Sequence, residues 1–478
     1  LTGESTNIDK SVETIEKEVP LADRTDMVFS GSLVTYGRAI VVVTETGMNT
    51  EIGKIATLMN QAKSKKTPLQ LSLDKFSSRL AVIIMAICVV VFGLSMFNGM
   101  SVLNSLMFAV ALAVAAIPEA LGSIVTIVQA MGTQKMAKEN AVIKDLKAVE
   151  SLGCVSVICS DKTGTLTQNR MRVEEIIHYA SIDERLLAEI IAVNSTAFLD
   201  ADANVIGNPT EGALLIRLRE EGFDYAALRE EAPIVDRMTF TTERKYMATI
   251  IQSKTTGKRL ICVKGASEIV RAMCMPDGKD AQVNEQLLLF QGRAMRTLAV
   301  AYAETTAERC EDALRDPQML FVAVAAIADP VRDDVPAAVA RCMKAGIDIK
   351  IVTGDTPATA REIARRIGLW HDETDSSRNE MTGVEFAAMS DEELLERVQA
   401  LKIMSRARPL DKQRLVRLLQ RKGEIVAVTG DGTNDAPALN FANVGLSMGS
   451  GTSVAKDASD ITLLDDSFTS IASAVMWG

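Results

Sequence analysis

Three short apolar runs, each followed at once by small and acidic residues, constrain this fold more than any other feature. Runs of this length and composition are typical of buried strands. Apolar strands alternate with helical patterns from residue 155 onward, which predicts a parallel α/β sheet. The runs and the residues after them are 155–159 with Ser160-Asp161-Lys162-Thr163-Gly164, 347–352 with Thr353-Gly354-Asp355, and 424–428 with Thr429-Gly430-Asp431.

The residues that follow these strands suit phosphate chemistry. Ligands of an open α/β sheet bind beyond the carboxyl ends of its strands. Glycine and threonine let backbone N–H groups approach an anion, and the carboxylates of Asp161, Asp431 and Asp435 could hold Mg²⁺. A single Asp-Gly pair is usually only a turn, but three such ends after strands favour a phosphate site. The sequence contains neither a GxxxxGK[ST] loop nor a GxGxxG fingerprint.

Composition excludes several classes of function. The net charge of -10 argues against binding to nucleic acid. The seven cysteines form no CxxC pair and there are only two histidines, so a zinc site is not expected. The cysteines are typical of reduced, intracellular core residues. A chain of 478 residues predicts two to four domains. We expect it to be a fragment, because it begins at Leu1 within a motif and ends as a new apolar run starts.

Two apolar runs predict a pair of membrane helices. Residues 80–97 carry no charge and residues 103–130 carry one, Glu119. Each run can supply the roughly 20 residues that a spanning helix needs. Basic residues precede the first run and follow the second, which places both outer ends in the cytoplasm. The alternative is a buried helical hairpin of a large soluble protein.

A proline and a glutamate inside the second run indicate a cation site. Pro118 lacks an N–H group and disrupts the helix, which would free the backbone carbonyls of Val114, Ala115 and Ile117. A carboxylate within a membrane helix is a functional candidate. Oxygen ligands including Glu119 suit a hard cation such as Ca²⁺. The alternative is a proline kink beside a protonated, structural glutamate.

Short motifs along nearly the whole chain resemble those of the P-type ATPases, in the order found in that family. Asp161-Lys162-Thr163-Gly164-Thr165 resembles their phosphorylation signature, which lies in a haloacid-dehalogenase-like domain. The other matching segments are Thr2-Gly3-Glu4-Ser5, Lys264-Gly265-Ala266, Asp329-Pro330-Val331-Arg332, Thr353-Gly354-Asp355 and 429–435.

The resemblance implies a multidomain α/β protein with membrane helices. Its core would be a haloacid-dehalogenase-like doubly wound phosphorylation domain interrupted by an α+β nucleotide-binding domain. Residues 1–55, rich in valine, glycine and threonine, would be strands of a partial β-rich actuator domain. The implied divisions are actuator 1–55, linker 56–78, transmembrane hairpin 79–133, stalk 134–153, phosphorylation domain 154–172 and 326–463, nucleotide-binding domain 173–325, and the start of another membrane helix 464–478.

The resemblance also implies a catalytic role for each matching residue. Asp161 would be the nucleophile that accepts the phosphoryl group of ATP. Mg²⁺ would be held by Asp161, the carbonyl of Thr163 and Asp431, with Asp435 nearby. The remaining catalytic residues would be Lys162, Thr353, Gly354, Asp355 and Lys412, and Glu4 would direct hydrolysis. The segment around Lys412 departs from the family pattern at Arg408.

The inserted domain would bind ATP. An exposed aromatic face can stack on adenine, and lysine or arginine nearby can meet phosphates. By the resemblance, Phe240 is the adenine platform, although an isolated phenylalanine is more often a core residue. The other implied ATP-binding residues are Glu211, Lys245, Lys264, Arg296, Arg406 and Asn434.

Two features separate the alternatives that remain. Phosphatases of the same superfamily commonly carry a second aspartate two residues after the nucleophile, and here that position is Thr163. The residue at this position and the two apolar runs both argue against a soluble phosphatase or nucleotide-binding protein.

Pro118-Glu119-Ala120-Leu121 resembles calcium pumps of the bacterial and sarcoplasmic-reticulum type, with a sodium or other cation pump as the alternative. ATP, the transported cation and the lipid bilayer of the cell membrane would be the partners.

Overall fold

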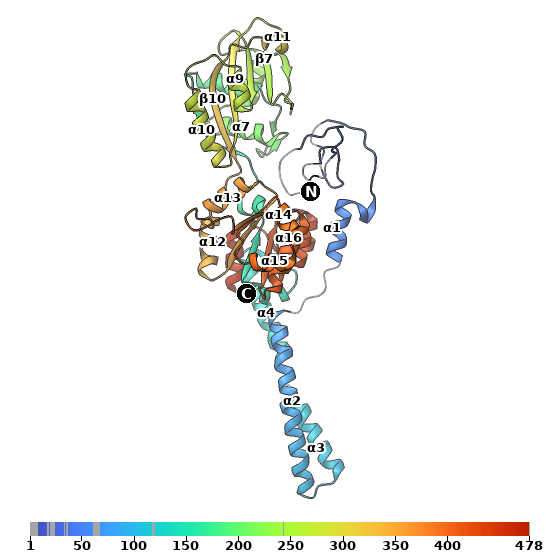
Figure 1. Ribbon diagram of the computed structural model, residues 1–478. Coiled ribbons are helices and arrows are strands. Elements are labelled where there is room, and N and C mark those ends of the chain that lie inside the picture. Colours follow the sequence, from blue (N-terminus) through green and yellow to red (C-terminus); the bar gives the residue numbers. More distant parts are fainter. Residues whose placement is uncertain are drawn as a thin grey trace.

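The computed structural model describes residues 8–16, 19, 24–32, 34, 37–60, 67–116, 120–241 and 243–477. Two α/β units lie one above the other, and a helical hairpin extends away from the lower unit (Figure 1). Among the residues singled out by sequence, Glu4, Ile117, Pro118 and Glu119 lie outside the described ranges.

The lower unit contains an eight-stranded sheet in the order β1-β16-β15-β14-β2-β11-β13-β12. All neighbouring strands are parallel except β1 and β16. A doubly wound α/β fold was predicted, and the sheet confirms it. The strands, in sheet order, are β1 (Ala141–Ile143), β16 (Ile461–Leu463), β15 (Val444–Met448), β14 (Val426–Gly430), β2 (Val157–Ser160), β11 (Asp348–Val352), β13 (Ile403–Ser405) and β12 (Glu380–Thr382).

Helices cover both faces of this sheet, which explains why its strands are apolar without alternation. Ile158 of β2 joins the core on one face, whereas Val157 and Cys159 join the core on the other. The first face packs against α5 (Lys147–Gly153), α12 (Val335–Lys344), α13 (Pro357–Arg366) and α19 (Phe468–Trp477). The second packs against α14 (Gly383–Ala388), α15 (Asp391–Arg397), α16 (Pro409–Arg421), α17 (Ala436–Phe441) and α18 (Ser453–Ala458).

The upper unit is inserted between β2 and β11 and contains an antiparallel sheet in the order β3-β10-β9-β8-β7-β6. Its strands are β3 (Arg172–His178), β10 (Leu320–Ala328), β9 (Arg296–Glu304), β8 (Arg259–Gly265), β7 (Tyr246–Gln252) and β6 (Ile234–Met238). One face packs on α6 (Glu184–Val193), α7 (Pro209–Glu220) and α8 (Tyr225–Glu231), beside the short strands β4 (Phe198–Leu199) and β5 (Val205–Ile206). The other face packs on α9 (Ser267–Ala272), α10 (Asp280–Gly292) and α11 (Cys310–Ala313).

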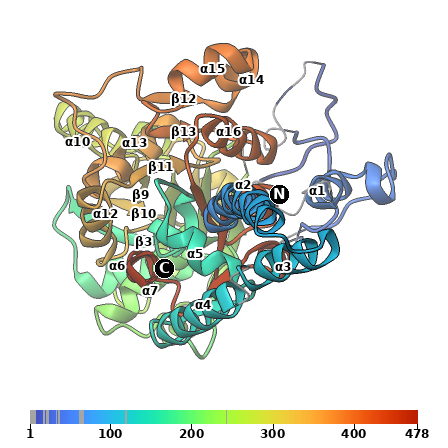
Figure 2. The same cartoon turned by 90° about the horizontal axis from the view of Figure 1, so that it is seen from below.

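The hairpin is formed by α2 (Pro68–Phe97) and α3 (Val102–Ala115), which lie side by side, and α4 (Ala120–Lys138) follows (Figure 2). Among the described helices, α2 alone is long and apolar enough to cross a membrane, and α3 is a shorter apolar helix. Only 11% of the most apolar 18-residue window of α2 is buried. That exposure argues against the alternative of a hairpin buried in a soluble core.

Two helices cover most of the described part of the predicted linker, residues 56–78. Helix α1 (Glu51–Asn60) covers its beginning, and α2 starts at Pro68. The cause is a complete set of helix-start signals, because Thr67 and Gln70 form a capping box around a proline at the first helical position.

The strands expected within residues 1–55 are absent from the part of this segment that the structure describes. A short helical turn, η2 (Gly47–Asn49), precedes α1, and residues 37–46 form no regular secondary structure. Ile40 and Val42 are exposed. Their sequence suits a strand, but an extended segment is stable only when neighbouring strands pair with it.

Carboxylates of the lower unit bind the N-terminal ends of two apolar helices. Glu150 of α5 accepts a hydrogen bond from the backbone N–H of Leu69 in α2, at 2.6 Å. Asp334 accepts hydrogen bonds from the side chains of Ser467 and Thr469, at 2.6 and 2.8 Å, and from the backbone N–H of Thr469. These contacts fix both helices to the eight-stranded unit.

Replacing Asp334 with alanine should destabilise the lower unit by about 1–2 kcal/mol at neutral pH, because the start of α19 loses its cap. Burial raises the pKa of Asp334, but the hydrogen bonds from Ser467 and Thr469 outweigh it and leave the pKa below its usual value. Its stabilisation is therefore present above pH 4 and declines as pH falls through the lowered pKa, since the ordinary aspartate value is about 3.9. Urea unfolding of wild type, Asp334→Ala and the exposed control Asp333→Ala, at several pH values, measures this. Equal losses in the two variants would contradict the capping role.

Candidate active site

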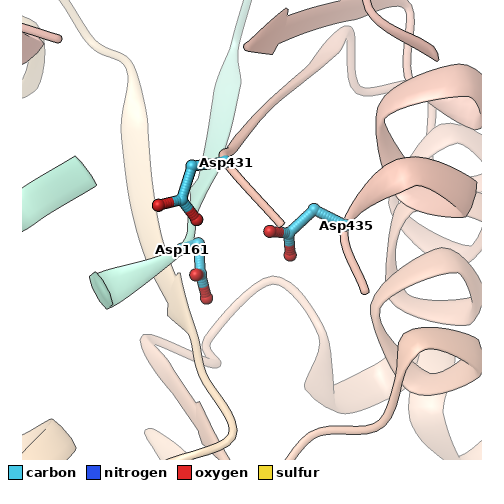
Figure 3. Close-up of side chains that lie close together, drawn as sticks. All are labelled: Asp161, Asp431 and Asp435. Atoms are coloured by element: carbon cyan, nitrogen blue, oxygen red, sulfur yellow. The ribbon is translucent and has the colours of Figure 1, made fainter. Parts of the chain in front are cut away.

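Three carboxylates converge at one edge of the eight-stranded sheet. Asp161 follows β2, whereas Asp431 and Asp435 follow β14, the parallel neighbour of β2. One carboxylate oxygen from each of the three side chains lies within 4.8 Å of the other two (Figure 3). The carboxyl ends of parallel neighbours share an edge, so this convergence follows directly from the topology.

The side chain of Lys412 lies between two of these carboxylates. Its Nζ atom donates to Oδ1 of Asp161 at 2.8 Å and to Oδ1 of Asp435 at 2.6 Å. All three side chains are buried. Helix α16 brings Lys412 there from its first turn, and Arg408, the residue that departs from the family pattern, pairs with Asp411 to cap that turn.

One lysine does not balance the negative charge of the cluster. Burial and the nearby Asp435 raise the pKa of Asp161 to about 6, although Lys412 lowers it. Burial, Asp161 and Asp435 together raise the pKa of Asp431 to about 8. Three clustered carboxylates, with the pKa values of Asp161 and Asp431 raised, fit a hard divalent cation whose charge would offset their repulsion. The residues present therefore suit Mg²⁺.

The loop after Asp161 is a tight turn, η3 (Lys162–Leu166), held by charged side chains. Lys162 pairs with Asp355 at 2.7 Å. Arg332 donates to the carbonyl of Gly164 and to that of Thr167, both at 3.1 Å. Thr163 is buried within this turn.

A glycine is required in this turn. Gly164 has φ of +73°, and a Cβ atom added there would collide with the carboxylate of Asp431. Gly432 is similarly enclosed, because an added Cβ would collide with Oδ1 of Asn434. Within the described chain, that buried oxygen has no hydrogen-bond partner. Gly164 therefore lets the loops after β2 and β14 approach closely, and Gly432 lets the loop after β14 fold tightly on itself.

The loop after β11 supplies the third side of the site. Thr353 is buried, and its hydroxyl accepts the backbone N–H of Asp355 at 3.1 Å. Its backbone N–H donates to the carbonyl of Met404 at 2.9 Å. Gly354 follows it, and the backbone N–H of Arg406 donates to the carbonyl of Asp355 at 2.9 Å.

In the upper unit, Glu211 and Lys264 form a buried ion pair at 2.9 Å. The carboxylate of Glu211 also accepts hydrogen bonds from the backbone N–H and the hydroxyl of Thr196. Burial alone would raise the pKa of Glu211, but Lys264 and Thr196 lower it to about 2. Glu211 is therefore ionised, and its carboxylate is held by the protein itself.

The other predicted nucleotide residues of the upper unit lie at the surface, as does Arg406, whereas Asn434 is buried beside Asp435. Phe240 follows β6 and has 48% of its area exposed. Lys245 lies just before β7 in the left-handed backbone region, at φ of +58°. Arg296, at the start of β9, donates to the hydroxyl of Thr210 at 3.4 Å. The exposed ring of Phe240 is available for stacking.

Half of the predicted ion site lies outside the described residues, as does Glu4 in the predicted hydrolysis loop. Val114 and Ala115 form the end of α3 and are exposed. The backbone N–H of Ala116 donates to the carbonyls of Leu112 and Val114 at this helix end. Helix α3 therefore ends at two of the residues predicted to supply carbonyl ligands.

Sequence reasoning assigned no role to Asp329 and Arg332. Asp329 accepts hydrogen bonds from the hydroxyl of Thr167 and the backbone N–H of Arg170, beside the link between the two units. Their motif, Asp329-Pro330-Val331-Arg332, was visible in the sequence. Its spacing alone did not show that these side chains hold the loop of Asp161.

Comparison with known proteins places this geometry in a family. The family model "P-type ATPase, cytoplasmic domain N" matches residues 184–334, and "P-type ATPase actuator domain" matches residues 1–60. Calcium-transporting ATPase 1 of Lactococcus lactis is 41% identical over an alignment that covers 100% of this chain and 57% of that protein. The chain belongs to the P-type ATPases. A calcium-transporting ATPase of Listeria monocytogenes is 42% identical, over 99% of this chain and 57% of its own length.

This P-type ATPase chain thus spans little more than half the length of these curated relatives. A solved structure of a zinc-transporting PIB-type ATPase matches with a TM-score of 0.64 and 22% identity. That match covers 89% of this chain and 58% of the other. At this identity the likeness concerns the fold alone.

Replacing Gly164 with alanine should weaken binding of a divalent cation to this P-type ATPase site. The added methyl group would displace the Asp431 carboxylate, in addition to about 1–2 kcal/mol of backbone strain. The matched control is Gly423→Ala, because Gly423 has φ of +91° and open space around its Cβ position. Titration with Mn²⁺, followed by electron paramagnetic resonance, should show weaker binding for Gly164→Ala only. Similar weakening in both variants would mean that strain, not contact with Asp431, is responsible.

Proposed function

We propose that this chain is the catalytic part of an ATP-driven Ca²⁺ pump that works through an aspartyl phosphate on Asp161. One observation carries the proposal: Asp161 lies with Asp431, Asp435 and Lys412 in a buried cluster at the carboxyl edge of a parallel sheet. The similarity of this whole chain to little more than half of proteins named calcium-transporting ATPases supports the choice of ion.

In the proposed phosphorylation step, a carboxylate oxygen of Asp161 attacks the γ-phosphorus of ATP and ADP leaves. Mg²⁺, when bound by Asp161, Asp431 and the carbonyl of Thr163, with Asp435 beside it, would neutralise charge on the transferring group. Lys412 holds Asp161 in place and supplies a positive charge beside the phosphate. The hydroxyl of Thr353, the backbone of Gly354, and Lys162, oriented by Asp355, would contact the phosphoryl oxygens.

ATP would reach Asp161 from the upper unit. Phe240 would stack on adenine, while Lys245, Arg296 and Arg406 offer positive charge for the phosphates. Lys264 would line the pocket, and its partner Glu211 would shape it from the adenine side. At the phosphate end, the amide nitrogen of Asn434, which donates to Asp435 at 3.2 Å in this structure, would contact the nucleotide.

Hydrolysis of the aspartyl phosphate would need a group from outside the eight-stranded unit. Thr163 stands where phosphatases of the superfamily carry an acid/base aspartate, so the phosphoenzyme should be long-lived. Glu4 would place the attacking water after the actuator segment moves towards Asp161. A soluble phosphatase would hydrolyse its aspartyl phosphate without a group such as Glu4 from another domain.

The transported ion would bind in a membrane, at the end of α3. Glu119, with the carbonyls of Val114, Ala115 and Ile117, would provide oxygen ligands of the kind that Ca²⁺ prefers. The exposed apolar surface of α2 supports a membrane location. A pump for Na⁺ or another cation is the alternative, and the experiment on Glu119 separates the two.

Two substitutions should separate phosphorylation from ATP binding in the complete pump. Asp161→Asn should abolish acid-stable phosphoenzyme from ATP and from inorganic phosphate, yet still bind ATP. Lys264→Ala should weaken ATP binding, yet still form phosphoenzyme from inorganic phosphate, because that reaction needs only the Asp161 site. Filter-bound radioactive phosphate and a fluorescent nucleotide measure the two properties. Phosphoenzyme in Asp161→Asn would overturn the assignment of the nucleophile.

Glu119→Gln should remove Ca²⁺-dependent phosphorylation from ATP in the complete pump, since the ion site loses its charged ligand. Phosphorylation from inorganic phosphate should persist, because it does not require the transported ion. Glu139→Gln, near the far end of α4, is the control. Normal Ca²⁺ activation of Glu119→Gln would refute the ligand role, whereas wild-type activation by Na⁺ alone would favour the alternative ion.

A further inference from the structure

Two buried hydroxyl groups join the strands that carry the catalytic aspartates. Ser160 ends β2 and Thr429 lies opposite it on β14. The hydroxyl of Thr429 donates to Oγ of Ser160 at 3.0 Å, and the hydroxyl of Ser160 donates to the backbone carbonyl of Asp161 at 2.9 Å. The two hydrogen bonds run in one direction, from β14 to Asp161.

Both hydroxyl groups lie in an apolar layer, where burying a polar group is unfavourable. Ser160 and Thr429 are 0% and 1% exposed. They lie two residues beyond Ile158 and Ala427, so they point to the same apolar face of the sheet. Buried hydroxyl groups without partners destabilise a protein. Alanine and valine would suit an apolar layer, so stability alone does not explain two hydroxyl groups here.

The hydroxyl pair completes a set of bonds around the backbone of Asp161. The backbone N–H of Asp161 donates to the carbonyl of Thr429 at 3.2 Å. The carbonyl of Asp161 accepts from Ser160, which is held in turn by Thr429. Both backbone polar groups of Asp161 are therefore tied to β14, and β14 leads into Asp431 two residues after Thr429.

We propose that Ser160 and Thr429 are positioning residues that set the distance between Asp161 and Asp431, and thereby the affinity of the site for a divalent cation. This inference rests on the proposed function, because it assigns metal binding to that carboxylate cluster. The pair touches neither carboxylate and acts only through the backbone. Loss of the Thr429 hydroxyl removes the hydrogen bond that holds Ser160 Oγ, so the carbonyl of Asp161 is no longer linked through Ser160 to β14.

The test measures Mn²⁺ affinity of the full chain in detergent by electron paramagnetic resonance. Thr429→Val keeps the shape of the side chain but removes the donor, and it should weaken binding about five- to tenfold, as expected for one lost hydrogen bond. Thr429→Ser retains the donor and should bind within about twofold of wild type. Binding of a fluorescent nucleotide by the upper unit should be unchanged in both variants.

A matched control separates positioning from general stability. Thr249 is a fully buried strand threonine in the upper unit, and its hydroxyl donates to Asn194 at 2.9 Å. Thr249→Val should lose stability in the same way without changing Mn²⁺ affinity. Wild-type affinity in Thr429→Val, or equal weakening in Thr429→Val and Thr429→Ser, would overturn the inference.

Asp431→Asn distinguishes a failure of this inference from a failure of the proposed function. It should abolish tight Mn²⁺ binding. If Asp431→Asn binds Mn²⁺ as wild type does, the proposed metal site is wrong and the inference falls with it. If Asp431→Asn loses binding while Thr429→Val does not, the metal site stands and only the positioning role is refuted.

Discussion

The arrangement of the eight-stranded unit depends on one buried ammonium group. Lys412 contacts Asp161 and Asp435 with 5% of its side chain exposed. Removing one member of such a buried set leaves an uncompensated charge, which typically costs about 3–5 kcal/mol. The set links the first turn of α16 to the end of β2 and to the start of α17. Apolar packing on both faces of the sheet leaves this edge as the place where charges converge.

The convergence of Asp161, Asp431 and Asp435 could be predicted from sequence because a parallel sheet brings strand ends to one edge. The pattern of strands followed by aspartate and glycine was sufficient for that step. The position of Lys412 could not be predicted in this way, because a lysine near a helix start is ordinarily a surface residue. Only its motif suggested a role, and only the structure showed that it lies between two aspartates.

Three local features of the fold were not predicted from the sequence. Strand β1 pairs with β16 from more than 300 residues away, and its three residues carry no signal of that pairing. The helix start at Pro68 was missed although Thr67 and Gln70 form a capping box there, because a basic, proline-containing stretch was interpreted as a linker. Residues 37–46 show the converse, because their strand-forming sequence forms no strand where no other part of the described chain pairs with it.

Contiguous contacts connect the sheet edge that carries Asp161 to the apolar helices. Arg332 holds the turn after Asp161 through the carbonyls of Gly164 and Thr167, and Asp334, two residues further, caps the start of α19. Before β2 in the chain, Glu150 of α5 binds the start of α2. Hydrogen bonds to a carboxylate are directional and short, so a displacement of the turn or of β2 must either carry these helix ends with it or break the caps. The site and the apolar helices are therefore joined by bonds with few alternative geometries, not by loose packing.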